Sequence, residues 1–130
     1  MKTVLAVDDA PHMLHLISYA LRPVGCAVLM AGRGEEAIDM ASRTHMDLLI
    51  IDVGLPGLSG IETALAIRSL PEYGLLPVIM MSARGLARTR YDAEASGANL
   101  FLTKPFSPME LRASVHALLR GVHHPVSEPY

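Results

Sequence analysis

Five short apolar runs, separated by longer segments of helical period, constrain the fold of this chain more than any other feature. No run exceeds six residues, and most have Gly, Pro or Asp nearby: TVLAV (3–7), CAVLMA (26–31), DLLII (47–51), PVIMM (77–81) and LFLT (100–103). Short length and such flanking residues favour strands over buried helices. Apolar strands without polar alternation are typical of a parallel sheet that is covered on both faces.

The segments between the runs are long enough to hold the helices that connect parallel strands. Successive runs start between 21 and 30 residues apart, and a parallel crossover needs a dozen or more residues. Asp9 is predicted to be the N-cap of the first helix, with Pro11 in its first turn. Apolar residues spaced three or four apart mark four of the helices: Leu14, Ile17 and Leu21; Ala37, Met40 and Ala41; Ile61 and Leu65; Leu111, Val115 and Leu118. The remaining segment has only Ala87, Tyr91 and Ala95 on one face, so it is predicted to be the weakest helix.

Five strand–helix units in series predict one doubly wound α/β domain. Its three layers would be a five-stranded parallel sheet with five helices on its two faces. At 130 residues the chain has about the length of one average domain. The domain is expected to cover residues 1–120, and GVHHPVSEPY (121–130), with two prolines and no periodicity, is expected to be a short tail.

Composition and charge exclude several classes of function. With 51% hydrophobic residues, the chain has too much apolar surface to be a disordered acidic tail. Its net charge of −2 provides no overall positive field for nucleic acid, so no direct contact with nucleic acid is expected. The strongly apolar runs are far shorter than the roughly 20 residues of a membrane span. The single cysteine, Cys26, cannot form an internal disulfide, which fits a reducing compartment. We therefore expect a cytoplasmic protein without a membrane segment.

Polar residues follow four of the five predicted strands. Asp8 and Asp9 follow the first, Asp52 the third, Ser82 the fourth and Lys104 the fifth. Taken singly, an Asp after a strand is usually a turn former or a helix cap. In an open α/β sheet, however, ligands bind at the carboxyl ends of the strands, so these five side chains are expected to meet at one edge.

The types of residue at this edge suggest a metal-assisted phosphoryl transfer. Three carboxylates that lie together repel one another unless a cation compensates their charge. A hard ion such as Mg²⁺ would do so with carboxylate, water and phosphate oxygens as ligands. Ser82 and Lys104 would then donate to phosphoryl oxygens, and Asp52 could be the carboxylate nucleophile that accepts the phosphoryl group.

Over residues 2–120 the sequence resembles the response-regulator receiver domain, in its single-domain, chemotaxis-regulator form. Four motifs carry the resemblance, in order and at strand ends: the acidic pair Asp8-Asp9, IIDVGLPGLSG with Asp52, VIMMSA with Ser82, and FLTKPF with Lys104. The resemblance implies a flavodoxin-like sheet with strand order 2-1-3-4-5. It also implies that a sensor histidine kinase or a histidine phosphotransfer protein phosphorylates Asp52.

The resemblance further implies how the site works. Asp9 and Asp52 would bind Mg²⁺ directly, Asp8 mostly through water, and Gly54 through its backbone carbonyl. Lys104 would contact the phosphoryl group, and its bond to Pro105 would be cis. The hydroxyl of Ser82 would turn toward the phosphoryl group, and the ring of Phe101 would rotate inward behind it. A downstream protein would then bind the face of the fourth helix, fifth strand and fifth helix.

Two positions depart from patterns found in other members of the family. Gly54 has no side chain where other members carry one that tunes access to the phosphoryl group. Arg84 stands at the second position that tunes its lifetime.

Two other functions are compatible with the same topology. One is a docking module that no longer needs phosphate, against which the presence of all five site residues argues. The other is a small flavin-binding protein, which would need Ser, Thr or Gly after the first strand where the chain has DDAPH.

Overall fold

The computed structural model describes residues 1–83 and 87–121. Its centre is a sheet of five strands: β1 (Thr3–Val7), β2 (Ala27–Ala31), β3 (Leu48–Asp52), β4 (Val78–Ser82) and β5 (Leu100–Thr103). All neighbouring strands are parallel, in the order β2-β1-β3-β4-β5. The predicted fold class and strand order are confirmed.

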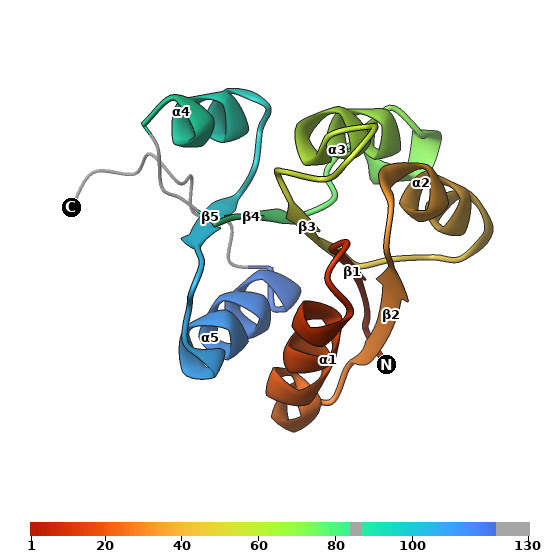
Figure 1. Ribbon diagram of the computed structural model, residues 1–130. Coiled ribbons are helices and arrows are strands. Elements are labelled where there is room, and N and C mark those ends of the chain that lie inside the picture. Colours follow the sequence, from red (N-terminus) through yellow and green to blue (C-terminus); the bar gives the residue numbers. More distant parts are fainter. Residues whose placement is uncertain (84–86, 122–130) are drawn as a thin grey trace.

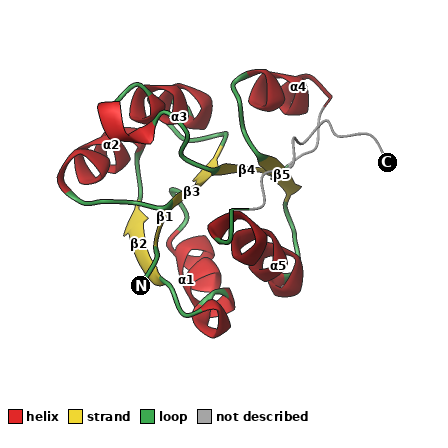
Figure 2. Cartoon of the chain, turned by 180° about the vertical axis from the view of Figure 1, so that it is seen from behind, coloured by secondary structure: helices red, strands yellow, loops and turns green. Residues whose placement is uncertain are grey.

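Helices cover both faces of this sheet and complete the three predicted layers. The α-helices are α1 (Pro11–Ala20), α2 (Gly34–Arg43), α3 (Gly60–Arg68), α4 (Ala87–Ala95) and α5 (Pro108–Leu119), and the short 3₁₀ helices are η1 (Arg22–Val24) and η2 (Pro71–Tyr73). Helices α2, α3 and α4 lie on one face, whereas α1 and α5 lie on the other (Figure 1). The view from behind shows the same division (Figure 2). Over the described part of the chain, no helix has the length and apolar character needed to cross a membrane.

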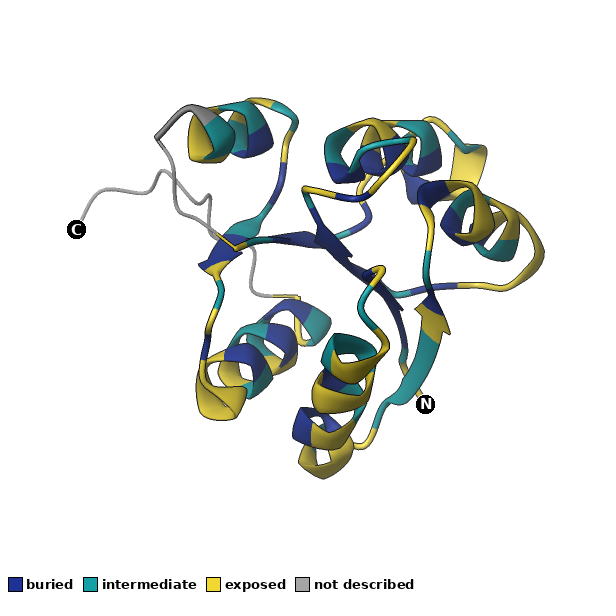
Figure 3. Ribbon diagram, viewed as in Figure 1, coloured by how far each residue is buried: buried dark blue, intermediate teal, exposed yellow. Residues whose placement is uncertain are grey.

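The three inner strands, β1, β3 and β4, are buried along nearly their whole length, which explains their continuous apolar sequences, whereas the edge strand β2 is partly exposed (Figure 3). Alternate residues point to opposite sides of a strand. In β1, Leu5 and Val7 therefore pack toward α2 and α3, whereas Val4 and Ala6 pack toward α1 and α5. The carboxyl ends of the strands form one edge of the sheet, which is where the polar residues of the sequence are placed.

Three local predictions are wrong. The N-cap of α1 is Ala10 and not Asp9, because Asp8 still pairs with the neighbouring strand through a hydrogen bond from its N–H to the carbonyl of Ala31 (3.1 Å). Helix α3 buries Thr63, Ala64 and Ile67 and exposes Leu65. Helix α4 likewise buries Ala93 and exposes Tyr91. The buried faces of these helices therefore differ from those that the apolar spacing predicted.

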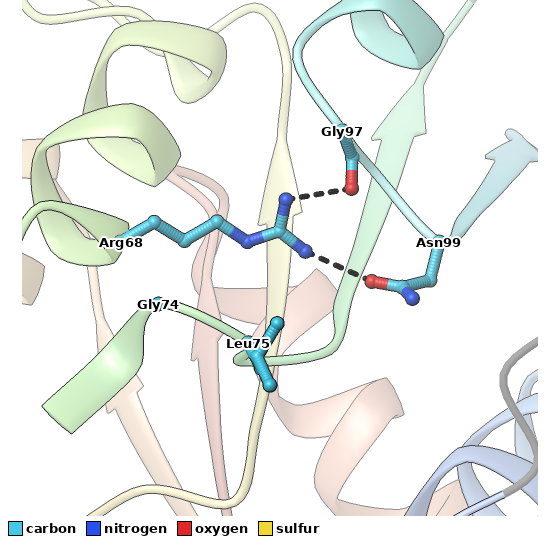
Figure 4. Close-up of a pocket in the computed structure, with 5 residues that line it drawn as sticks. All are labelled: Arg68, Gly74, Leu75, Gly97 and Asn99. Atoms are coloured by element: carbon cyan, nitrogen blue, oxygen red, sulfur yellow. Dashed lines mark hydrogen bonds between the residues drawn. The ribbon is translucent and has the colours of Figure 1, made fainter.

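Arg68 joins two connections at the amino end of β4 (Figure 4). Its guanidinium donates to the carbonyl of Leu76 (2.7 and 3.1 Å), to the carbonyl of Gly97 (2.6 Å) and to Oδ1 of Asn99 (2.9 Å). Gly97 has a φ of +93°, and a Cβ there would lie only 2.6 Å from Nη1 of Arg68. Together with Gly74 and Leu75 these residues line a hollow of about 350 Å³. The end of α3 is thereby fixed to the turn that leads from α4 into β5.

Candidate functional site

Three carboxylates meet at the carboxyl ends of β1 and β3. These strands are neighbours in the sheet, with Val7 opposite Ile51, so Asp8 and Asp9 come out beside Asp52. One carboxylate oxygen from each of the three residues lies within 4.8 Å of the others. Asp8 and Asp52 are buried, with 1% and 8% of their surface exposed, whereas Asp9 is exposed. A group of carboxylates with one accessible member fits a hard divalent cation that keeps part of its water shell.

Lys104 brings a positive charge to this acidic group from the far end of β5. Its Nζ lies 2.7 Å from Oδ2 of Asp8 and 3.4 Å from Oδ1 of Asp52. The backbone N–H of Lys104 donates to the carbonyl of Ser82 (2.7 Å), which extends the pairing of β4 with β5. The peptide bond between Lys104 and Pro105 is cis, the geometry that the resemblance implies. Lys104 therefore links the end of β5 to the ends of β1 and β3.

Burial and charge act in opposite directions on Asp52. Burial raises the pKa of its carboxyl group, and the neighbouring Asp8 carboxylate raises it further. Lys104 and the backbone of Gly54 lower this pKa, but the balance stays above the ordinary value. For Lys104, burial lowers the pKa, but Asp8 and Asp52 together outweigh burial and the pKa is raised. Lys104 is therefore positive at neutral pH, and its single charge contacts two of the three carboxylates, which leaves an excess of negative charge that a divalent cation can balance.

The loop after β3 fixes the backbone of Asp52. The N–H of Val53 donates to the carbonyl of Met81 (2.8 Å), and the N–H of Gly60 donates to the carbonyl of Val53 (3.1 Å). A Cβ on Gly60 would collide with the backbone carbonyl of Asp52, so only glycine allows this close approach. A reciprocal pair of hydrogen bonds between Ser59 and Glu62 then begins α3.

Gly54 leaves one side of the Asp52 carboxylate without a neighbouring side chain. A Cβ at this position would lie 3.9 Å from Oδ2 of Asp52, so a larger residue would stand beside the carboxylate. Gly54 itself is exposed. The other position expected to tune the phosphorylated state, Arg84, lies outside the described residues.

Ser82 and Phe101 lie on β4 and β5, one and two strands away from Asp52 in the sheet. Ser82 ends β4 opposite Thr103, and Phe101 lies on β5 with 7% of its surface exposed. The guanidinium carbon of Arg90 in α4 lies 5.5 Å from the centre of the Phe101 ring. The sequence did not point to Arg90, because its only visible signal was the spacing of four residues to Glu94.

The chain is similar to known proteins over most of its length. The model of the response regulator receiver domain family matches residues 4–116. The phosphate regulon transcriptional regulatory protein PhoB of Rhizobium meliloti is 41% identical over 117 residues, which are 90% of this chain and 52% of that protein. The chain spans about half the length of the curated relatives it matches.

Solved structures show the same fold. The chemotaxis response regulator CheY4 of Vibrio cholerae superposes with a TM-score of 0.84 at 31% identity, over 91% of this chain and 98% of that one. The receiver domain of the sensor histidine kinase PA1611 from Pseudomonas aeruginosa PAO1 has a TM-score of 0.82 at 29% identity, over 92% and 98% of the two chains. That domain was crystallised with a magnesium ion coordinated in its active-site cleft.

Proposed function

This chain belongs to the receiver domains of two-component response regulators, and we propose that Asp52 is the residue that accepts the phosphoryl group. Receiver domains are phosphoacceptor signalling domains and not classical enzymes. The observation that carries the proposal is the position of Lys104, whose ammonium group contacts both Asp8 and Asp52 beside an exposed third carboxylate. The donor would be the phosphohistidine of a sensor histidine kinase or of a histidine phosphotransfer protein.

The acidic group fits Mg²⁺, the cofactor that the resemblance implies. Its three carboxylate oxygens are close enough to share one ion, and the hard oxygen donors suit it. Asp9 and Asp52 would hold the ion directly, with the backbone carbonyl of Gly54, and Asp8 through water. When bound, the ion would offset the negative charge of the phosphoryl oxygens.

The transfer follows from the positions of the side chains. An oxygen of the Asp52 carboxylate attacks the phosphorus atom, the bond from phosphorus to the donor imidazole breaks, and the imidazole nitrogen keeps the electron pair. Lys104 has three N–H donors, so it can stay bound to Asp8 while it donates to a phosphoryl oxygen. The hydroxyl of Ser82 donates to another. Hydrolysis of the product, at a rate tuned at Gly54 and Arg84, would return Asp52 to its free form.

The output of the domain would be a change in the face formed by α4, β5 and α5. Ser82 turns toward the phosphoryl group, and Phe101 fills the space behind it. Phosphorylation stabilises a state that the free protein already samples. The partner that binds this face would be a protein and not a nucleic acid or a membrane. The domain would act in the cytoplasm, a reducing compartment that fits the free thiol of Cys26.

The proposal is tested with acetyl phosphate and Mg²⁺, followed by intact-protein mass spectrometry. We expect one phosphoryl adduct on the wild type, none on Asp52→Asn or Asp52→Ala, and none on the wild type in EDTA. Asp39→Asn is the matched control, because Asp39 is an exposed aspartate on α2 with 62% side-chain exposure; it should keep the adduct. An undiminished adduct on Asp52→Asn would refute the proposal. No adduct on the wild type would also refute it and would favour a docking module that works without phosphate.

A further inference from the structure

We propose that Arg90 is a positioning residue that holds the Phe101 ring in its buried place and so couples α4 to the site at Asp52. The coupling rests on the proposed function. The contact between Arg90 and the ring of Phe101 depends only on the geometry of α4 and β5.

The contact joins a cation to the face of an aromatic ring. The guanidinium carbon of Arg90 lies 5.5 Å from the centre of the Phe101 ring, within the distance of about 6 Å at which such contacts are attractive. Phe101 has 7% of its surface exposed and packs in the core between the sheet and helices α2 to α4. Arg90 therefore covers a ring whose other neighbours belong to the core.

An ion pair orients the guanidinium of Arg90. Its Nε lies 3.1 Å from Oε2 of Glu94, one turn further along α4, and their side chains are 48% and 27% exposed. A surface pair of this kind adds little stability by itself. Its effect here is to restrict the rotamers of a long side chain, which keeps the guanidinium over the ring.

The described side chains of α4 bury little apolar surface. Among its side chains in the described part of the chain, only Ala93 is fully buried, and a methyl group covers little apolar area. Beyond the helix, Arg68 holds the carbonyl of Gly97 and the side chain of Asn99 (Figure 4). The end of the α4 segment is thus attached to α3 independently of Arg90.

These positions give Arg90 a specific effect. Loss of its guanidinium would release the ring without detaching the helix, because the contacts of Arg68 remain. Since this contact joins the ring to α4, movement of the ring changes the placement of the helix, and the reverse holds with the same coupling free energy.

The ring can be observed directly by ¹⁹F NMR. The chain has two phenylalanines, Phe101 and Phe106, so biosynthetic incorporation of 4-fluorophenylalanine gives two resonances. Phe106 is 9% exposed and packs on the opposite face of the sheet, so its resonance is an internal reference for the fold. The difference in chemical shift between H₂O and D₂O reports how far each ring is exposed to solvent.

Arg90→Met keeps the apolar stem of the side chain and removes the charge. We expect the Phe101 resonance to move or broaden, its solvent isotope shift to grow, and the ratio of exposed to buried ring to rise about two- to fivefold, the size of one partly exposed cation–π contact. Glu94→Gln should have a smaller effect of the same sign. Arg43→Met is the matched control: Arg43 pairs with Asp39 four residues earlier in α2 (2.6 Å) and should leave both resonances unchanged.

Two results would overturn the proposal. If the Phe101 resonance of Arg90→Met keeps the wild-type shift and solvent isotope effect, Arg90 does not hold the ring. This measurement needs no phosphate, so it decides the point even if Asp52 accepts no phosphoryl group. The second arm measures the affinity for beryllofluoride with Mg²⁺, which we expect to fall about two- to fivefold in Arg90→Met and not in Arg43→Met. A freed ring with unchanged affinity would overturn the coupling to Asp52.

Discussion

The negative charge of Asp52 serves the proposed phosphoryl transfer but lowers the stability of the folded protein. It lies at the end of a fully buried strand, within 3.4 Å of Lys104, and it shares that ammonium group with Asp8. The pKa of its carboxyl group is raised by burial above all, and then by Asp8. The folded chain therefore resists ionisation of Asp52 more than the unfolded chain does.

We expect Asp52→Asn to stabilise the metal-free protein at pH 7, because it removes a carboxylate whose ionisation is disfavoured by burial and by Asp8. Below the ordinary pKa of 3.8, the carboxyl group is neutral in both states, and asparagine and aspartic acid behave alike. As the pH rises through the higher pKa of the folded protein, the wild type loses stability because its buried group must ionise. Urea unfolding in EDTA at pH 7 and at successively lower pH measures the difference.

Asp39→Asn is the control for this experiment, since its exposed carboxylate should give no such gain. A variant Asp52→Asn that is less stable than the wild type at pH 7 would contradict the expectation. So would a gain that does not shrink as the pH falls.

That the five proposed site residues share one edge of the sheet was predictable from the sequence for one physical reason. The carboxyl ends of parallel strands share an edge, so a polar residue just after each apolar run had to appear there. The contacts of Arg90 and Arg68 were not predictable in this way. Each depends on how a long side chain crosses from a helix to a segment far away in the sequence, and no periodicity records that.

Helix α4 has a polar sequence and forms part of the proposed output face. Of its described side chains, Ala93 alone is fully buried, whereas α5 buries Leu111, Val115 and Leu118. Burial of large apolar side chains is what gives a helix a high free energy of local opening.

We therefore expect the backbone amides of α4 to exchange with solvent faster than those of α5. Hydrogen–deuterium exchange with peptide-level mass spectrometry, at constant pH and in the absence of phosphate, measures both helices in one sample. Helix α1, which buries Ile17 and Ala20, is the second reference. Equal protection of α4 and α5 would show that burial does not govern the stability of this helix.

The predicted strands agree closely with the observed ones, because short apolar runs between turn residues leave little choice of boundary. The predictions for the helices were less accurate. The spacing of apolar residues placed Leu65 on the inner face of α3, but this face is formed by Thr63, Ala64 and Ile67. The inner face includes a threonine, which a search for apolar residues alone does not find. For Asp9, the pairing of Asp8 with Ala31 delayed the start of α1 by one residue.

The molecule as a whole combines a nearly neutral surface composition with a concentrated negative charge at one edge. The net charge is only −2, yet three carboxylates lie close together, and one ammonium group contacts two of them. Removing their mutual repulsion should stabilise every part of the fold that holds them together.

We expect Mg²⁺ to raise the midpoint of thermal unfolding of the wild type, and the rise should continue with the logarithm of the Mg²⁺ concentration above the dissociation constant. Binding to the folded state alone adds about 2.7 kcal/mol at one hundred times the dissociation constant. Differential scanning calorimetry across a Mg²⁺ titration measures the effect. The variant Asp9→Asn should need more Mg²⁺ for the same shift, whereas Asp39→Asn should follow the wild type. A midpoint that does not respond to Mg²⁺ would contradict the assignment of the acidic group as a metal site.

The contact between Lys104 and Asp8 spans 96 positions of the chain. Contacts so distant in sequence require that the intervening loops have already closed. The nucleophile proposed at Asp52 can therefore be complete only when the last strand has joined the sheet. A chain stalled before that step would have its carboxylates but not the ammonium group that balances them. Phosphorylation would therefore require a completely folded domain. Incompletely folded copies of the protein would give no signal, and they would not give a false one.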